Sequence, residues 1–257
     1  MKRKEPLEMA RKRHEQMLKL VARSFYKELI NYGVNSAEVL SVAAHLLDNV
    51  MQPGDPNSAE KESHRHLFTI ADVRDAWVAA KQVGLGEVSL IPMRSGHVHQ
   101  VANWLKSPVI QESFHPAFPD SEEALAGYFH ATERDYFVIL FQDSPVGIVG
   151  AENIDAESCK LEMRKLIGDP AMHGKGIGKR ATFLFLYHVF LLRKFEKVYV
   201  HSMDTNIRNL NLNGKFGFEL EGVFLQDVIL QQERRDVVRM ALVRSAWLEL
   251  FSGTRAR

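Results

Sequence analysis

Three glycines at alternate positions, Gly174, Gly176 and Gly178, form the part of the sequence with the clearest chemical meaning. They follow a strand-like segment and lead into a strongly apolar segment of helical length. Glycine lets the backbone adopt unusual torsions and approach a ligand closely, and the amide groups at a helix N-terminus favour an anion. The spacing matches neither a Walker loop nor the G-x-G-x-x-G dinucleotide fingerprint. We therefore expect this turn to bind a phosphate or pyrophosphate; the alternative is a glycine turn that serves packing alone.

Two titratable side chains on predicted strands could move a proton. Glu162 lies in the strand-like segment 161–167, and His201 ends the segment 197–201. A positioned carboxylate can act as a general base, and an imidazole titrates near neutral pH. Each has a structural alternative: Glu162 could order water or pair with a lysine, and a lone strand histidine is more often a satisfied core residue.

The first 86 residues have the pattern of helices. Apolar residues recur at steps of three and four along the first of them. These residues are Leu18, Val21, Phe25 and Leu29. Two pairs with capping-box spacing, Asn35 with Glu38 and Thr69 with Asp72, open a second and a third helix, the third reaching about residue 83. We therefore predict a small all-helical domain over residues 1–86.

From residue 87 the hydrophobic period changes, and helices alternate with strands. We expect strands at 88–93, 136–141, 146–150, 161–167 and 197–201, and helices at 101–105 and 181–192. Such an alternation is typical of an α/β domain with a mixed sheet. We assign this domain to residues 87–252.

Several motifs of the second domain resemble the GNAT superfamily of N-acetyltransferases. His173 takes the Gln/Arg position of that family's acetyl-CoA loop, Gln/Arg-x-x-Gly-x-Gly/Ala, and Gly176 and Gly178 are its glycines. The segment 206–218 resembles the family's N-x-R-A-I-x-L-Y-E-K-x-G-F segment. The most similar subgroup holds ribosomal-protein alanine, spermidine and amino-sugar N-acetyltransferases. The resemblance covers about residues 87–250, and we recognise no family in the first 86 residues.

The resemblance implies a GNAT-like acyl-CoA transferase fold that binds acetyl-CoA as acyl donor. The backbone of the glycine loop would hold the pyrophosphate, and backbone groups of the preceding strand would pair with the pantetheine arm. The cofactor-binding residues implied are Leu166, Ile167, His173, Gly174, Lys175, Gly176, Ile177, Gly178, Lys179, Asn206 and Asn213. Asn213 is a departure, because many relatives carry a tyrosine there that can protonate the leaving thiolate, and asparagine cannot.

The same resemblance assigns roles in the chemistry. Glu162 is the candidate general base, acting through water on the attacking amine, and His201 is the second candidate. The loop 111–120 lies where relatives contact their acceptor, with Phe114 and Phe118 as pocket walls. His115 of this loop, and Glu152 after a predicted hairpin, are further candidates to contact the amine. The structural alternative for both is an ordinary surface loop.

The composition excludes several classes of protein. Lys and Arg total 33 and Asp and Glu total 32, and this net charge of +1 argues against a nucleic-acid binder. No segment approaches the roughly 18 apolar residues of a membrane helix. The single cysteine, Cys159, excludes a disulfide framework, and His64 and His66 lack a third metal ligand. We expect a cytoplasmic protein with no metal, no nucleic-acid partner and no membrane association.

The favoured function is therefore acetyl-CoA-dependent N-acetylation of a primary amine, by direct attack on the thioester. A small-molecule acceptor such as an amino sugar or polyamine is preferred. One alternative is a protein N-terminal or lysine acetyltransferase that docks its target through the helical domain. Another is a catalytically weak acyl-CoA-binding regulator, which the asparagine at position 213 would suit. The helical domain could serve dimerisation, docking or closure of the site, so a homodimer is one expected arrangement.

Overall fold

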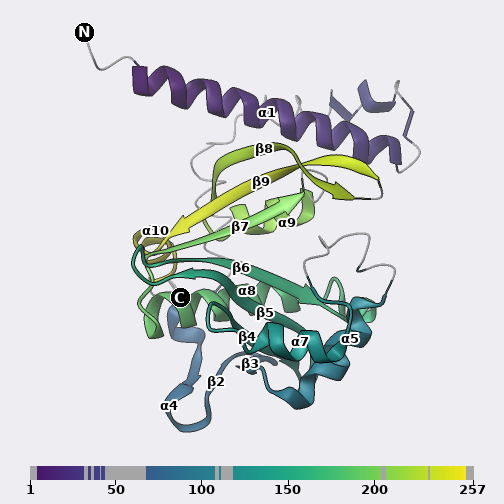
Figure 1. The fold of residues 1–257 in the computed structure, drawn as a ribbon. Coiled ribbons are helices and arrows are strands. Elements are labelled where there is room, and N and C mark those ends of the chain that lie inside the picture. Colours follow the sequence, from purple (N-terminus) through teal and green to yellow (C-terminus); the bar gives the residue numbers. More distant parts are fainter. Residues whose placement is uncertain are drawn as a thin grey trace. The chain divides into compact units, whose positions relative to one another are not determined.

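The structure is a computed structural model that describes residues 5–31, 34–35, 38–40, 42–43, 68–107, 110, 118–203, 207–230 and 232–252 (Figure 1). The chain forms two compact units. The first comprises Met1–His66, His201–Lys215 and Leu220–Met240, and the second comprises Leu67–Val200, Phe216–Glu219 and Ala241–Arg257.

A sheet runs through the second unit in the order β1-β2-β3-β4-β5-β6-β7. Its strands are β1 (Arg74–Ala76), β2 (Gln82–Leu85), β3 (Val88–Pro92), β4 (Asp135–Phe141), β5 (Ser144–Asp155), β6 (Lys160–Ile167) and β7 (Lys197–Met203). Neighbours from β1 to β6 are antiparallel, and β6 and β7 are parallel. The strands expected from the apolar runs are confirmed, and together with the helices they give the predicted mixed α/β fold.

Helices pack on this sheet because alternate residues of each strand point to opposite sides. On one face, α5 (Val98–Leu105) and α7 (Glu122–Phe129) share a core with Tyr136, Ile148 and Leu166. Helix α8 (Ile177–Tyr187) contacts β2, β3, β5 and β6 and continues into a π-helical turn, His188–Leu192. Helix α10 (Arg244–Phe251) packs Trp247 and Phe251 against Phe183 of α8, with ring centroids 5.5 and 5.2 Å apart.

The prediction of a helix from Thr69 to about residue 83 is wrong. Thr69 and Asp72 do bond reciprocally, with the Thr69 amide 2.8 Å from Asp72 Oδ2, but they open only the 3-10 turn Ile70–Asp72. The chain then forms β1, the short helix α4 (Trp77–Ala80) and β2. Val83, 1% exposed, pairs with Leu90 of β3 and is buried there. Burial between strands therefore outweighs the local capping signal.

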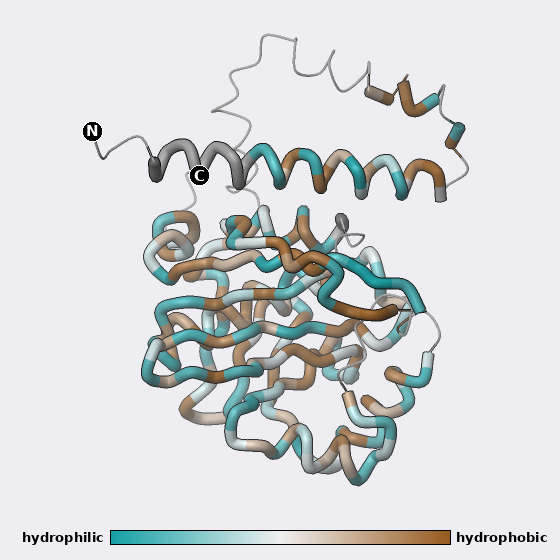
Figure 2. The backbone as a smooth tube through the Cα atoms, turned by 45° about the horizontal axis from the view of Figure 1, so that its top comes forward, coloured by the Kyte–Doolittle hydropathy of each residue, from teal (hydrophilic) through white to brown (hydrophobic). Residues whose placement is uncertain are grey.

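The first unit contains α1 (Glu5–Asn31), α9 (Ile207–Gly214), and the neighbouring strands β8 (Glu219–Leu230) and β9 (Glu233–Val243). Helix α1 confirms the first predicted helix, and hydrophobic and hydrophilic residues are interspersed along it (Figure 2). The predicted capping box is also present: the Asn35 amide lies 2.9 Å from Glu38 Oε2, and the Glu38 amide lies 3.1 Å from Asn35 Oδ1. The end of that second helix, and His64 and His66, lie outside the described residues.

No helix in the described part of the chain is long and apolar enough to cross a membrane. The division into a helical domain and an acetyltransferase domain at residue 86 stays a prediction. In the structure, the sheet already begins at β1, twelve residues earlier than that boundary.

Candidate active site

The glycine turn connects the end of β6 to the start of α8. Gly174 has a φ of 81°, and Gly176, the N-cap of α8, has a φ of 74°. Both angles lie in the left-handed region, where a residue with a Cβ is strained. His173 ties the turn to the strand, since its Nε2 lies 3.0 Å from the carbonyl oxygen of Ile167. The turn therefore leads into the first amides of α8, which have no acceptor within the helix.

Two arginines lie beside this first turn of α8. The Nη1 atom of Arg180 donates to the carbonyl of Lys175 over 3.5 Å, and a Cβ at Gly86 would lie 3.6 Å from Arg180 Nε. Arg74 Nη2 donates to the carbonyl of Gly86 over 2.5 Å. Neither arginine forms an ion pair with an acidic side chain of the described residues. Sequence reasoning missed Arg74, because it assigned this segment to a helix.

A lysine lies under the start of α8. Lys165 Nζ donates to Thr182 Oγ1 over 2.6 Å, and Thr182 Oγ1 donates in turn to the carbonyl of Gly178 over 2.8 Å. Burial lowers the pKa of Lys165 to about 8. The Lys165 ammonium therefore lies close to the helix N-terminus where we predict that an anion binds. Its burial makes the charged form less favourable.

Strands β6 and β7 pair over three residues and then part. The paired residues are Lys160, Leu161 and Glu162 of β6 with Lys197, Val198 and Tyr199 of β7. Strand β6 continues to Ile167 and stays paired with β5 on its other side, where Leu166 lies opposite Ile148 and Ile167 opposite Gly147. The backbone of residues 164–167 is therefore not paired with β7, which leaves polar groups for another partner.

Two carboxylates face each other across β5 and β6. Glu152 pairs in register with Glu162, and the two residues are 5% and 3% exposed. Arg164, two residues after Glu162 and hence on the same face, places Nε 2.7 Å from Glu152 Oε2 and 3.4 Å from Glu162 Oε1. The N–H does not point at either oxygen, so both contacts are ion pairs without a hydrogen bond. Burial lowers the pKa of Arg164, but the two carboxylates outweigh it and raise that pKa overall.

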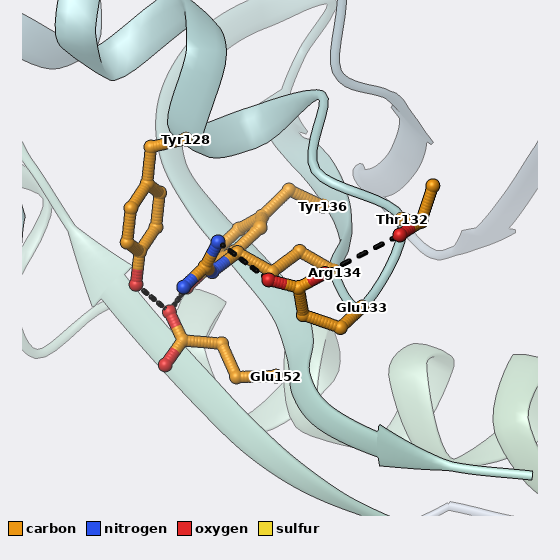
Figure 3. Close-up of polar contacts among 6 residues, drawn as sticks. All are labelled: Tyr128, Thr132, Glu133, Arg134, Tyr136 and Glu152. Atoms are coloured by element: carbon orange, nitrogen blue, oxygen red, sulfur yellow. Dashed lines mark hydrogen bonds and ion pairs between the residues drawn. The ribbon is translucent and has the colours of Figure 1, made fainter.

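Two tyrosines donate hydrogen bonds to Glu152. The hydroxyls of Tyr128, from α7, and Tyr136, from β4, both donate to Glu152 Oε1, the second over 2.5 Å. Figure 3 shows the Tyr128 hydroxyl directed at this carboxylate, and Arg134 Cζ lies 3.9 Å from the centre of the Tyr128 ring. Burial and the hydrogen bond to Glu152 raise the pKa of Tyr128 to about 12, and burial raises the pKa of Tyr136 well above its usual value. Both phenols are therefore neutral donors at physiological pH.

Glu162 is anchored separately. Asn153 Nδ2 donates to Glu162 Oε2 over 2.8 Å. Asn153 reaches this position because the β5–β6 register shifts between Glu152 and Asp155, where Asn153 has a φ of 49°. Asn153 and Arg164 together therefore fix the position of the Glu162 carboxyl group.

The structure brings together Phe118 and Glu152, two of the four predicted acceptor residues. The centroid of the Phe118 ring lies 5.2 Å from that of Tyr128 and 6.1 Å from that of Tyr136. These are the two tyrosines that donate hydrogen bonds to Glu152. Phe114 and His115 lie outside the described residues. Sequence reasoning missed Tyr128, Tyr136 and Arg164, although the alternation along β6 could have indicated Arg164 from Glu162.

Other predicted residues are less defined. Asn206 lies outside the described residues. His201 is exposed and meets Phe224 edge to face, with centroids 5.6 Å apart. Asn213, on α9, is 1% exposed, and neither atom of its amide has a hydrogen-bond partner in the described structure. The roles given to these three residues stay predictions. The described residues contain no group of three or more potential metal ligands.

Comparison with known proteins places this geometry in context. Residues 87–219, just over half of the chain, match the family model described as an acetyltransferase (GNAT) domain. The spermidine N(1)-acetyltransferase of Escherichia coli (strain K12) is 23% identical over 159 residues, which cover 59% of this chain and 82% of that protein. The protein of the same name from Vibrio cholerae serotype O1 is 23% identical over 164 residues, covering 63% and 91%. The solved structure of spermidine N-acetyltransferase from Vibrio cholerae in complex with CoA and spermine has a TM-score of 0.59 at 22% identity, covering 63% of this chain and 99% of that one.

Proposed function

The chain belongs to the GNAT family of acetyltransferases, which use acetyl-CoA as acetyl donor, and we propose that it acetylates a primary amine of a small molecule. The observation that carries the proposal is the glycine turn at the start of α8. Its positive φ angles at Gly174 and Gly176, and the nearby cations Lys165 and Arg180, suit a pyrophosphate. We place the reaction in the cytoplasm, as the single cysteine suggests.

In this proposal the amides of residues 174–179 hold the pyrophosphate of acetyl-CoA, with His173 fixing the turn on β6. The backbone of Leu166 and Ile167, which is not paired with β7, accepts the pantetheine arm. Asn206 and Asn213 are the further contacts proposed for the donor. The buried amide of Asn213 has no hydrogen-bond partner among the described residues, which supports this role because such a group is costly unless a ligand satisfies it.

Acetyl-CoA supplies the electrophilic thioester, and the residues of the chain position and deprotonate the amine. The amine nitrogen bonds to the thioester carbon, the carbon–sulfur bond breaks, and a proton leaves the amine. Glu162 receives this proton, directly or through water; Asn153 and Arg164 hold its carboxyl group in place. Asn213 cannot supply a proton to the sulfur, so coenzyme A leaves as the thiolate, or water or another side chain protonates it.

Calorimetric titration with acetyl-CoA tests the donor site. Gly176→Asp adds bulk and negative charge at a left-handed position and should abolish micromolar binding. Gly127→Asp is the matched control, since a side chain there meets nothing within 4 Å, and binding should persist. Absence of binding to the unaltered protein would sink the proposal.

Release of free thiol with a panel of amines tests the chemistry. Glu162→Gln should lower kcat by about two orders of magnitude while leaving acetyl-CoA binding intact. Spermidine belongs in the panel, because the relatives above are spermidine N-acetyltransferases. If the unaltered protein binds acetyl-CoA but acetylates none of the amines, the result would instead favour an acyl-CoA-binding regulator.

A protein acceptor is the second candidate, and one observation favours it. Four large apolar side chains of α1 are exposed by 40 to 52%. They are Leu18, Val21, Tyr26 and Ile30. If α1 docks a protein target through these side chains, Leu18→Glu combined with Val21→Glu should lower acetylation of that target without changing turnover of small amines. Equal activity on both substrates would exclude docking through α1.

A further inference from the structure

The two carboxylates of the candidate acceptor site already have partners. Glu152 receives two phenol hydroxyls on Oε1 and the Arg164 guanidinium on Oε2. Glu162 receives the amide of Asn153 and the same guanidinium. A polycationic acceptor binds most tightly to carboxylates that have no cation beside them, because the desolvation of both charges opposes each new ion pair. This site does not offer that arrangement.

Each of the three carboxylates around the site has a guanidinium neighbour. Glu152 and Glu162 contribute two negative charges, Arg164 lies between them, and Arg134 stacks on the Tyr128 ring with its Nη1 3.5 Å from Glu133 Oε1. A spermidine-like acceptor would bring two or three further positive charges next to two guanidinium groups. Like charges at such distances are mutually unfavourable.

The guanidinium of Arg164 has unused donors. Nε lies nearest the two carboxylates, and the terminal nitrogens Nη1 and Nη2 form no hydrogen bond within the described residues. The side chain is 22% exposed, so solvent or a ligand can reach it, while both of its carboxylate partners are nearly enclosed. The two terminal nitrogens form a planar fork that matches a carboxylate or phosphate.

We infer that the acceptor carries an anionic group, a carboxylate or a phosphate, close to its primary amine, and that Arg164 binds this group. The inference rests on the proposed function, since it names the acceptor class of the same site. Arg164 is then a specificity-determining residue. It selects amino acids, amino-sugar phosphates and similar acceptors over polyamines.

Acceptor pairs that differ in one group test this inference. The probes are glucosamine 6-phosphate against glucosamine and 5-aminopentanoate against 1,5-diaminopentane, with spermidine as the polycation, all read by thiol release. We expect the anionic member of at least one pair to have a kcat/KM at least about tenfold above that of its partner and of spermidine. A higher kcat/KM for spermidine, or no preference within both pairs, would overturn the inference. If no amine is acetylated, the proposed function fails instead.

Arg164→Lys separates recognition from structure. It keeps the charge between Glu152 and Glu162 but removes the fork. We expect the KM of the anionic acceptor to rise about tenfold, with the KM of its uncharged or cationic partner unchanged. Arg193→Lys is the matched control, because Arg193 pairs with Asp135 outside the site and should alter neither KM. A uniform fall in kcat for both members of a pair would mean that Arg164 only holds the carboxylates, and a thermal melt confirms that each variant is folded.

Discussion

Replacement of Lys165 by methionine should stabilise the protein and weaken its binding of CoA. The amine of Lys165 lies under α8, bonded to Thr182 Oγ1, and burial lowers its pKa from 10.5 to about 8. A difference of 2.5 pKa units corresponds to at most about 3 kcal/mol of unfavourable free energy when the amine is protonated in the folded state. Loss of the hydrogen bond to Thr182 offsets about 1 kcal/mol of the gain. We therefore expect Lys165→Met to raise the free energy of unfolding by about 2 kcal/mol at pH 7.

The pH dependence follows from the direction of the shift. The pKa is lower in the folded protein than in the unfolded chain, so the penalty is complete below about pH 8 and disappears as the pH rises to 10.5. Urea unfolding of both proteins at pH 7 and pH 10 should therefore show the gain of Lys165→Met shrinking at the higher pH. Affinity for CoA should fall in the wild type as the pH passes 8, but not in the variant, because only the wild type loses a charge near the phosphates.

Lys160→Met provides the control. Lys160 lies on the same strand, but its side chain is 39% exposed and pairs with Asp155 over 3.3 Å. Its replacement should change stability by less than about 0.5 kcal/mol. A loss of stability in Lys165→Met at pH 7, or a gain of equal size at both pH values, would refute the reasoning. Unchanged CoA affinity would refute the link to the phosphate site.

Three further changes test other buried groups. His188 is buried, neither of its ring nitrogens has a hydrogen-bond partner among the described residues, and burial lowers its pKa to about 4, below the unfolded value of 6.5. Stability should therefore fall by about 2 kcal/mol from pH 7 to pH 5, and urea unfolding of His188→Phe should show no such loss. Gly150→Ala places a Cβ 2.4 Å from the Tyr136 ring, so the free energy of unfolding should fall by about 1–3 kcal/mol and the melting temperature with it. Gly127→Ala, which has open space around its Cβ, should not lower the melting temperature. Asn213→Leu should leave the melting temperature of the free protein unchanged or higher, because it removes a buried amide that has no partner among the described residues. The same change should reduce the rise in melting temperature that CoA produces, and an unchanged rise would exclude Asn213 from the donor site.

The sequence by itself determined what depends on neighbours along the chain. The apolar period fixed α1 and the strands β3 to β7, and the alternate glycines fixed the turn before α8, where Gly174 and Gly176 take positive φ values. The capping pairs at Asn35 and Thr69 are also local, and both form. These features follow from steric and hydrogen-bonding preferences within a few residues, so one sequence is enough to predict them.

Only the tertiary structure decided which distant residues meet. The segment 74–85 follows a capping pair at Thr69 and Asp72, yet it forms β1, the short helix α4 and β2, because Val83 gains more from burial beside β3 than a longer helix could provide. Arg164, Tyr128 and Tyr136 come from three different elements and converge on Glu152 through the register of β4, β5 and β6. That register depends on pairings between strands and on a bulge at Asn153, which no local pattern encodes. The donor loop could therefore be predicted from the sequence, whereas the arrangement of charged groups in the acceptor site could not.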